Sequence, residues 1–328
     1  MVDKLSSIRN KQSFLTTFKS TSTEVIDKLS QWFKLETIYS SNAISGSNMS
    51  RMETMQVLEK SIAVGGKTLI EHYEIVNHAL AYGFIISLMN RNRIEETDLI
   101  KIHQLLQKNI DEENAGQYRV TAPRFVGSPV VLPDPAKVPK LIADFINNIN
   151  NEKDTISKAL KAHYALVTIH PFKDGNGKTA RLIMNLLLMQ GGYPPAFIKP
   201  KDKAKYLKSL ELAQTGESLE PFTELVLESI ERSLNIFIKA VKGDDLPSIK
   251  ARESLIKIGE LAKETNESLS TLRYWVKRGL IEVSDTAESG YQFFDKGEII
   301  KCRLIRRLQD ERLTLEEVQK RLDNEMVG

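Results

Sequence analysis

Helical periodicity dominates this chain and restricts its fold more than any other feature. Apolar residues recur at intervals of three and four in AHYALVTI (residues 162–169), ARLIMNLLLM (180–189) and FTELVLESIERSLNIFI (222–238). The longer stretch TLIEHYEIVNHALAYGFIISLM (68–89) has the same spacing. This spacing gives a helix one apolar face. We therefore predict that the first large part of the chain is mostly α-helical.

One segment has the signal of strands instead. In PRFVGSPVVLPDP (123–135), two short apolar runs flank Gly127 and Ser128, and Pro133 and Pro135 close the second run. Short apolar runs around a glycine are typical of a β-hairpin, and prolines end strands. The sequence predicts one small hairpin here.

The segment KGDDLPS (242–248) marks a domain boundary, because a long helical pattern ends there in Gly, acidic residues and Pro. About eighty residues follow, with short helices and a β wing. At 328 residues the chain is long enough for two domains. We expect an N-terminal helical region at 1–95, a catalytic core at 96–242 and a separate domain at 249–328.

Composition excludes several classes of protein. Hydrophobic residues make up 41% and charged residues 27% of the chain, as in ordinary globular proteins. No apolar run approaches the roughly 20 residues of a membrane span, and the single Cys302 cannot form an internal disulfide. We expect a soluble cytoplasmic protein with no membrane partner; the net charge of +3 does not decide on nucleic acid. The oligomeric state stays open.

The segment HPFKDGNGKTAR (170–181) ends like a phosphate-binding P-loop but is not one. A P-loop has a glycine five residues before the glycine of Gly-Lys-Thr, and Phe172 stands at that position. The preceding segment is also the end of an amphipathic helix, whereas a P-loop follows a buried strand. Both observations exclude the P-loop.

The residues of this segment still indicate a polyphosphate site. Backbone N–H groups at a helix N-terminus bind anions, and glycines allow a phosphate to approach. Lys178 and Arg181 lie three residues apart, on one side of that helix. Asp174 would repel phosphate unless a cation such as Mg²⁺ lay between them, and His170 is of the residue type that serves as a general base.

The segment resembles the signature of the Fic family, with Lys178 where the first Arg is more usual. The resemblance implies an all-helical catalytic fold. It also implies transfer of AMP from ATP to a hydroxyl side chain (Tyr, Thr or Ser) of a target protein, with release of pyrophosphate. His170 would take the proton from the hydroxyl, and Asp174 would hold Mg²⁺. The resemblance assigns nucleotide binding to Gly175, Asn176, Gly177, Lys178 and Arg181.

Further segments resemble other parts of the same family. The predicted hairpin corresponds to the flap that binds the target segment by strand addition, at Phe125, Val126 and Gly127. GQYR (116–119) precedes it, and Tyr206 corresponds to an adenine-side residue, although a buried aromatic of the core has the same pattern. His163 fits either a metal ligand or, more simply, a structural histidine.

The segment YSSNAISGSNMS (39–50) resembles the inhibitory motif of the family, which has Ser or Thr, three residues, Glu, and then Gly or Asn. Ser41 and Gly46 fit this motif, but Ser45 stands in place of the Glu. In the family, that Glu pairs with the second Arg of the signature. Because a serine is short and uncharged, we expect that Ser45 does not reach or neutralise Arg181, and that the enzyme is released from autoinhibition.

The last eighty residues resemble a MerR-type winged helix-turn-helix in IGELA, TLRYW, RGLI and LTLEEVQ. The resemblance implies DNA binding, with contacts from Arg273, Lys277 and Arg278 on the second helix. Residues 249–328 carry fifteen basic and fifteen acidic residues, which is modest for a phosphate-backbone binder. A protein-docking module on the same fold stays open. Lys301, Arg303, Arg306 and Arg307 form a further basic cluster.

Two other functions remain as alternatives to the enzyme. One is a DNA-binding regulator that senses a nucleotide through a degenerate pocket, and the other is a scaffold that only binds partners. The presence of both His170 and Asp174 favours the enzyme, because a sensor needs no base.

Overall fold

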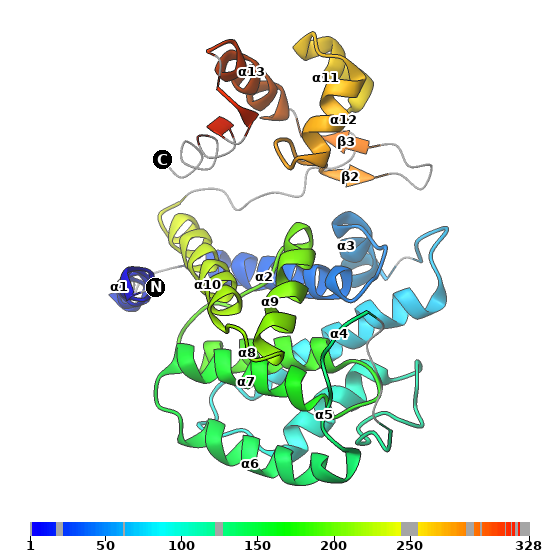
Figure 1. The fold of residues 1–328 in the computed structure, drawn as a ribbon, viewed down its shortest axis with the longest axis vertical. Coiled ribbons are helices and arrows are strands. Elements are labelled where there is room, and N and C mark those ends of the chain that lie inside the picture. Colours follow the sequence, from blue (N-terminus) through cyan, green and yellow to red (C-terminus); the bar gives the residue numbers. More distant parts are fainter. Residues whose placement is uncertain are drawn as a thin grey trace. The chain divides into compact units, whose positions relative to one another are not determined.

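The computed structural model describes residues 2–17, 22–61, 63–121, 127–243, 255–286, 292–295, 297–311, 313–315, 317–318 and 321. The chain divides into two compact units, Met1–Pro247 and Ser248–Gly328. Figure 1 shows the helices that make up the first unit. They are α1 (Val2–Thr17), α2 (Thr23–Ile44), α3 (Arg51–Lys60), α4 (Leu69–Ser87), α5 (Glu96–Gln107), α6 (Val138–Asn151), α7 (Thr155–Ile169), α8 (Asn176–Gln190), α9 (Lys203–Gln214) and α10 (Glu220–Val241), with the 3₁₀ turns η1 (Pro135–Lys137) and η2 (Pro200–Asp202).

Helix α8 forms the centre of this unit. Its residues from Leu182 to Met189 are all buried, as expected of a helix surrounded by other helices. It lies along α7 and also contacts α2, α4 and α5 (Figure 1). The surrounding helices therefore fix the position of the N-terminus of α8.

Local sequence signals explain where the important helices begin and end. Thr68 and Glu71 form a capping box at the start of α4, which satisfies two backbone N–H groups that the helix leaves open. Asp154 caps α7 by accepting from the N–H of Ser157. Helix α7 is followed by its C-cap residue His170, which has the left-handed conformation, and α8 begins after Gly175.

The first unit is not divided at residue 95. Its main hydrophobic core joins Ile44 and Tyr82 from the N-terminal helices to Leu99, Leu186 and Leu227 from the later ones. The regions 1–95 and 96–242 thus share one core, and the boundary between them is a proposal about function.

The described part of the predicted hairpin is irregular. Phe125 and Val126 lie outside the described residues, and Gly127 is in a turn with φ of +77°. Residues 128–134 contain no strand. Pro129 and Pro133 have no N–H to give to a strand ladder, which explains why this arm does not form a regular strand. The expectation of a second strand here was wrong.

The second unit contains a small sheet and short helices. Strands β1 (Ile256–Lys257), β3 (Gln292–Phe294) and β2 (Asp285–Thr286) pair antiparallel in that order, with Ile256 opposite Phe294 and Asp285 opposite Phe293. The helices are α11 (Ile258–Thr265), α12 (Leu269–Lys277) and α13 (Gly297–Asp310). Leu272 and Trp275 of α12 pack with Phe294 and Ile305 in a separate core. The predicted mostly helical fold with a C-terminal winged helix-turn-helix is confirmed.

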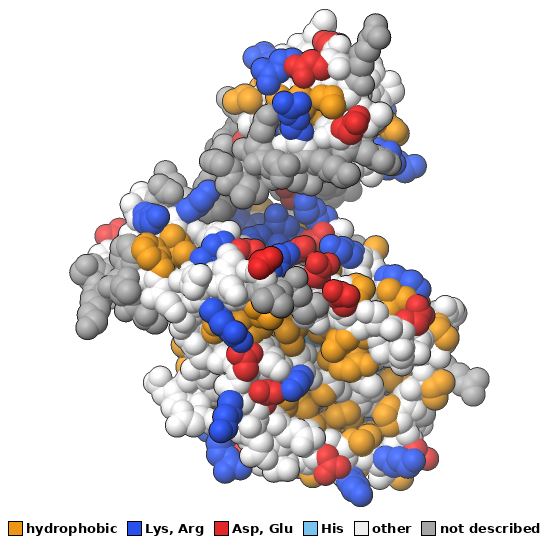
Figure 2. All heavy atoms as spheres, turned by 60° about the vertical axis from the view of Figure 1, so that its left-hand side comes forward, with side chains coloured by type: hydrophobic (Ala, Val, Ile, Leu, Met, Phe, Trp, Pro, Cys, Tyr) orange, Lys and Arg blue, Asp and Glu red, His pale blue; other side chains and the backbone are white. Residues whose placement is uncertain are grey.

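Among the described residues, no helix combines the length and the apolar character needed to cross a membrane. The face of the molecule in Figure 2 carries basic and acidic side chains interspersed with one another. This surface agrees with the small net charge of +3.

Candidate functional site

The loop between α7 and α8 is closed by the side chain of Asn176. Its Oδ1 accepts from the N–H of Phe172 at 2.9 Å, and its Nδ2 donates to the carbonyl oxygen of Phe172 at 2.8 Å. Both groups of the amide are thus satisfied, and the residue is buried. The side chain of Asn176 therefore fixes the loop. The prediction that Asn176 and its neighbours bind phosphate stays a prediction.

The aromatic ring of Phe172 anchors this loop in the core. Phe172 is fully buried and stacks on the imidazole of His103 from α5, with ring centroids 3.7 Å apart. His103 Nδ1 accepts from the N–H of Gly116 at 2.9 Å, so Nε2 carries the proton and donates to the Asp174 carbonyl oxygen at 2.9 Å. Burial lowers the pKa of His103 to about 4, which keeps the ring in this neutral form near pH 7.

His170 occupies a restricted backbone conformation at the end of α7, with φ of +50°. Its Nδ1 lies 3.4 Å from the carbonyl oxygen of Val167. Burial lowers its pKa to about 4, opposed by the contact with the Val167 carbonyl and, to a smaller extent, by the Asp174 carboxylate. The imidazole is therefore unprotonated at neutral pH and able to accept a proton.

Arg119 ties the loop to the chain on both sides of the predicted flap. Its Nε donates to the carbonyl oxygen of His170 at 2.7 Å, Nη1 to Thr121 at 2.8 Å and Nη2 to Pro133 at 2.6 Å. Its backbone N–H donates to the carbonyl of Pro171 at 2.9 Å. The guanidinium thus holds His170 and the two ends of residues 121–133 in one place.

The N-terminus of α8 is open to an anion. Gly175 stands at the N-cap with φ of +76°, so no side chain caps the helix. A Cβ at Gly175 would lie 2.7 Å from Gln107 Nε2, and only glycine fits this position without displacement. The first-turn N–H groups point out of a helix N-terminus, where anions are favoured.

The residues around this terminus fit Mg²⁺ only together with a nucleotide. Asp174 is exposed beside the terminus, and the described residues contain no group of three or more side chains able to hold a metal ion. Mg²⁺ is usually bound by one or two carboxylates with phosphate oxygens and water. Asp174 would supply one such carboxylate.

Arg181 of α8 is held by uncharged oxygens from α2 and α9. Its Nε donates to Ser41 Oγ at 2.8 Å, and its Nη2 donates to the Ser41 carbonyl oxygen at 2.9 Å and to Ser45 Oγ at 3.0 Å. Nη1 lies 3.5 Å from the Tyr206 hydroxyl. The expectation that Ser45 does not reach Arg181 was wrong, because the end of α2 lies directly against α8. A serine hydroxyl still adds no negative charge.

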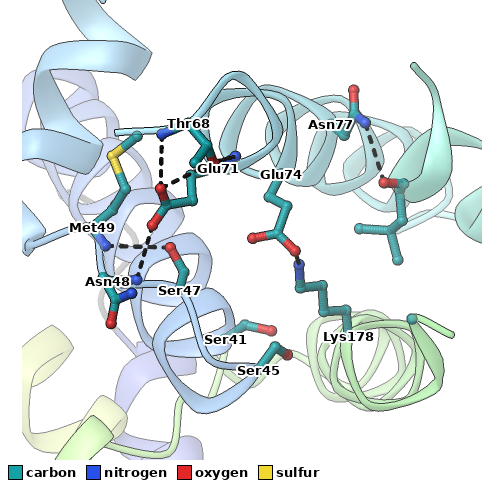
Figure 3. A network of polar contacts seen from close by, with 12 residues as sticks. Ser41, Ser45, Ser47, Asn48, Met49, Thr68, Glu71, Glu74, Asn77 and Lys178 are labelled. Atoms are coloured by element: carbon teal, nitrogen blue, oxygen red, sulfur yellow. Dashed lines mark hydrogen bonds and ion pairs between the residues drawn. The ribbon is translucent and has the colours of Figure 1, made fainter. Parts of the chain in front are cut away.

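Lys178 is paired with a carboxylate that the sequence did not single out. Its Nζ lies 2.8 Å from Glu74 Oε1 on α4, and Figure 3 shows this pair close to the two serines at the end of α2. Burial lowers the pKa of Lys178, and Glu74 opposes this effect. His78, one turn further along α4, is fully buried; burial and the two cations Lys178 and Arg181 lower its pKa and keep it neutral.

Tyr206 lies in the core and not on an open surface. It is 1% exposed, its hydroxyl lies 3.0 Å from His163 Nε2, and its ring contacts Phe222. His163 is likewise fully buried, with its pKa lowered to about 3 by burial. These contacts favour the structural interpretation of both residues; stacking of Tyr206 on a base stays a prediction.

In the second unit, α12 presents basic and aromatic side chains to solvent. Arg273, Lys277 and Arg278 are exposed, and the Arg278 guanidinium lies 5.9 Å from the centre of the Tyr274 ring. Three of the four residues of the other basic cluster are engaged within the unit: Arg306 pairs with Glu267, Arg303 donates to the Glu264 carbonyl at 3.0 Å and Lys301 lies 3.9 Å from Glu298. Of the two basic groups, α12 is therefore the better placed for a phosphate backbone.

Two family profiles match parts of the chain. Residues 93–188 match the profile described as the Fic/DOC family, and residues 256–325 match the MerR HTH family regulatory protein profile. The chain is 37% identical over 215 residues to the Protein adenylyltransferase Fic of Drosophila grimshawi, covering 64% of this chain and 44% of that relative. It is 36% identical over 234 residues to the protein of the same name from Culex quinquefasciatus, covering 69% and 46%. The chain thus spans less than half the length of these curated relatives.

Solved structures show the same likeness. Fic-1 (residues 134–508) from C. elegans is 30% identical, with a TM-score of 0.67, and the match covers 73% of this chain and 72% of that one. A Fic-domain signaling protein from Bacteroides thetaiotaomicron is 23% identical with a TM-score of 0.69, and the match covers 74% and 99%; at this identity it supports the fold.

Proposed function

Because the chain belongs to the Fic/DOC family, we propose that it transfers AMP from ATP to a hydroxyl side chain of a target protein. The observation that carries the proposal is the fixed loop His170–Asn176, which holds an unprotonated imidazole next to an uncapped helix N-terminus. Curated relatives at 36–37% identity bear the name protein adenylyltransferase, which supports the same activity.

In the proposed reaction, the nucleotide phosphates lie against the first turn of α8. The hydroxyl oxygen of the target forms a bond to the α-phosphorus, and His170 takes the proton from that hydroxyl. The bond between the α-phosphorus and the bridging oxygen breaks, and pyrophosphate leaves. The N–H groups of Gly177 and Lys178 stabilise charge on the phosphate oxygens. Asp174 would hold Mg²⁺, which supplies further neutralisation of the phosphates.

The flap and the regulation belong to the same proposal. Residues 125–127 would bind the target segment, and Arg119 contacts Thr121 and Pro133 on either side of them in the chain. Arg181 would bind the γ-phosphate once it leaves Ser41 and Ser45. Since its acceptors among the described residues are uncharged, no carboxylate from this part of the chain has to be displaced from Arg181, and we propose that the enzyme is derepressed in this respect.

Labelling tests the transfer. ATP labelled at the α-phosphate, incubated with the protein and a lysate, should label a protein band, and His170→Ala should remove the label. Intact binding of ATP without any transfer would refute the enzyme and support the nucleotide sensor. Transfer from ATP labelled at the γ-phosphate instead would indicate kinase-like chemistry and a different role for Arg181.

A second proposal concerns the C-terminal unit. We propose that it binds DNA through α12, because its three basic residues are exposed on one helix of a MerR-like fold. Binding of duplex DNA by the full chain should weaken with salt, with a slope of about 0.9 per phosphate contacted. Replacing Arg273, Lys277 and Arg278 by Ala should reduce both affinity and slope, and no change would favour a protein-docking module.

A further inference from the structure

The two basic residues of the proposed phosphate site are held in different ways. Arg181 contacts only uncharged oxygens among the hydrogen bonds described above, whereas Lys178 faces the carboxylate of Glu74 at 2.8 Å. The side chains of Lys178 and Glu74 are 10% and 25% exposed, so this ion pair is partly shielded from water. Partial burial makes such a pair stronger than one on an open surface.

Glu74 is the carboxylate of α4 that faces α8. The other carboxylate of this helix, Glu71, is used at the helix start, where it accepts from the backbone N–H groups of Thr68 and Asn48. Figure 3 shows Glu71 directed toward those groups and Glu74 directed toward Lys178. Glu74 has no role in capping α4 and contributes its charge to the site itself.

We propose that Glu74 sets the affinity of this site for polyphosphates by competing with them for Lys178. A bound nucleoside triphosphate brings several negative charges to the first turn of α8, and it must share or take the Lys178 ammonium from Glu74. The negative charge of Glu74 makes the electrostatic potential at Lys178 less positive, and this weakens the binding of every anion that contacts Lys178. This inference rests on the proposed nucleotide site but not on the transfer reaction.

The competition predicts a dependence on the number of phosphates. Nucleotides that carry β- and γ-phosphates should be affected by Glu74, because these groups extend along the first turn toward the basic side chains. AMP has a single phosphate, which the backbone N–H groups of the helix terminus accommodate, and it should be nearly insensitive to Glu74.

The variant Glu74→Gln keeps the size of the side chain and removes its charge. In calorimetric titrations with a non-hydrolysable ATP analogue and Mg²⁺, we expect it to bind about tenfold more tightly than the wild type, with AMP affinity unchanged. The matched control is Glu231→Gln. Glu231 also pairs with a lysine of another helix, Lys11, at 2.7 Å and with similar exposure, 23%. This control should leave both affinities unchanged.

A second background isolates the role of Lys178. In a Lys178→Gln protein, Glu74→Gln should no longer change the affinity for the analogue, because the competed group is gone. If Glu74→Gln still increases the affinity for the analogue in the Lys178→Gln protein, competition for Lys178 is refuted. The result would then indicate direct repulsion between Glu74 and the phosphates.

The remaining outcomes also decide the question. Weaker or unchanged binding of the analogue by Glu74→Gln, or equal tightening for AMP, would refute the inference. If the analogue binds more tightly but no AMP is transferred to any protein, the transfer proposal fails and the inference stands. If neither wild type nor variant binds the analogue, both fail together.

Discussion

Replacing Ser45 by Glu tests how Arg181 is controlled. Ser45 Oγ lies 3.0 Å from Arg181 Nη2, so a glutamate at this position, two carbons longer, places its carboxylate against the guanidinium. Two unit charges about 4 Å apart attract by about 4 kcal/mol at an effective dielectric constant near 20. Arg181 is already buried, with only 5% of its surface exposed. Pairing it with a glutamate therefore removes little more water from the cation, and desolvation of Arg181 hardly opposes the attraction.

One opposing effect reduces the gain. Ser45 is the C-cap of α2, and a negative charge at a helix C-terminus costs about 0.3–1 kcal/mol. Partial solvation of the new carboxylate lowers the gain further, to a net value of about 2–3 kcal/mol. A γ-phosphate would have to displace this pair, so the affinity for ATP should fall about 30- to 150-fold.

The assay compares Ser45→Glu with Ser45→Gln, which has the same shape and no charge. We expect Ser45→Glu to weaken binding of a non-hydrolysable ATP analogue and to slow AMP transfer, with AMP affinity unchanged and Ser45→Gln close to the wild type. An equal loss in both variants would mean that bulk and not charge obstructs the site. Unchanged binding and an unchanged rate in Ser45→Glu would refute the assignment of Arg181 to the γ-phosphate.

Three further results are expected from the geometry. His170→Ala should slow transfer about a thousandfold, with the affinity for the ATP analogue preserved. Because burial lowers the pKa of His170 to about 4, kcat/KM of the wild type should stay level between about pH 6 and 8 and fall below about pH 5, where the ring is protonated. An inflection of the profile near pH 6.5 would contradict this. The pKa of His103 is about 4 in the folded chain and about 6.5 in the unfolded chain, so the unfolded chain binds more protons and stability falls as the pH drops from about 6.5 toward 4. In urea unfolding between pH 7 and 5, the free energy of unfolding of the wild type should fall by about 2 kcal/mol more than that of His103→Gln. Equal losses in the two proteins would refute this. Arg119→Lys keeps the charge, but its donors sit on one nitrogen and cannot span the carbonyls that Nε, Nη1 and Nη2 reach separately. Calorimetry should show a destabilisation of about 3 kcal/mol; a melting temperature like that of the wild type would show that these contacts contribute little.

The sequence was sufficient for the helices and for the loop between α7 and α8. Apolar spacing of three and four predicted α7 and α8, and the glycines between them marked the turn. The signature then placed His170, Asp174 and Arg181 around one helix N-terminus because these residues are close along the chain. Interactions of this local kind follow from chain geometry alone, without knowledge of how distant helices pack.

Contacts between distant segments were not predictable in the same way. Glu74 lies 104 residues before Lys178, and nothing in the periodicity of α4 says which of its faces packs on α8. Arg119 donates to backbone carbonyls, which every residue has, so its partners leave no mark in the sequence. Ser45 was judged by the length of its side chain, whereas the packing of α2 against α8 brings its hydroxyl to Arg181.

The different partners of Arg181 and Lys178 imply an order in which they meet a polyphosphate. Lys178 and Glu74 together contribute no net charge to the site, whereas the acceptors of Arg181 leave its positive charge uncompensated. The field that attracts an approaching anion therefore comes mainly from Arg181 and the terminus of α8. Lys178 becomes available only when phosphate is close enough to compete with Glu74. A single carboxylate on α4, acting on Lys178, would then lower the affinity for long polyphosphates relative to AMP.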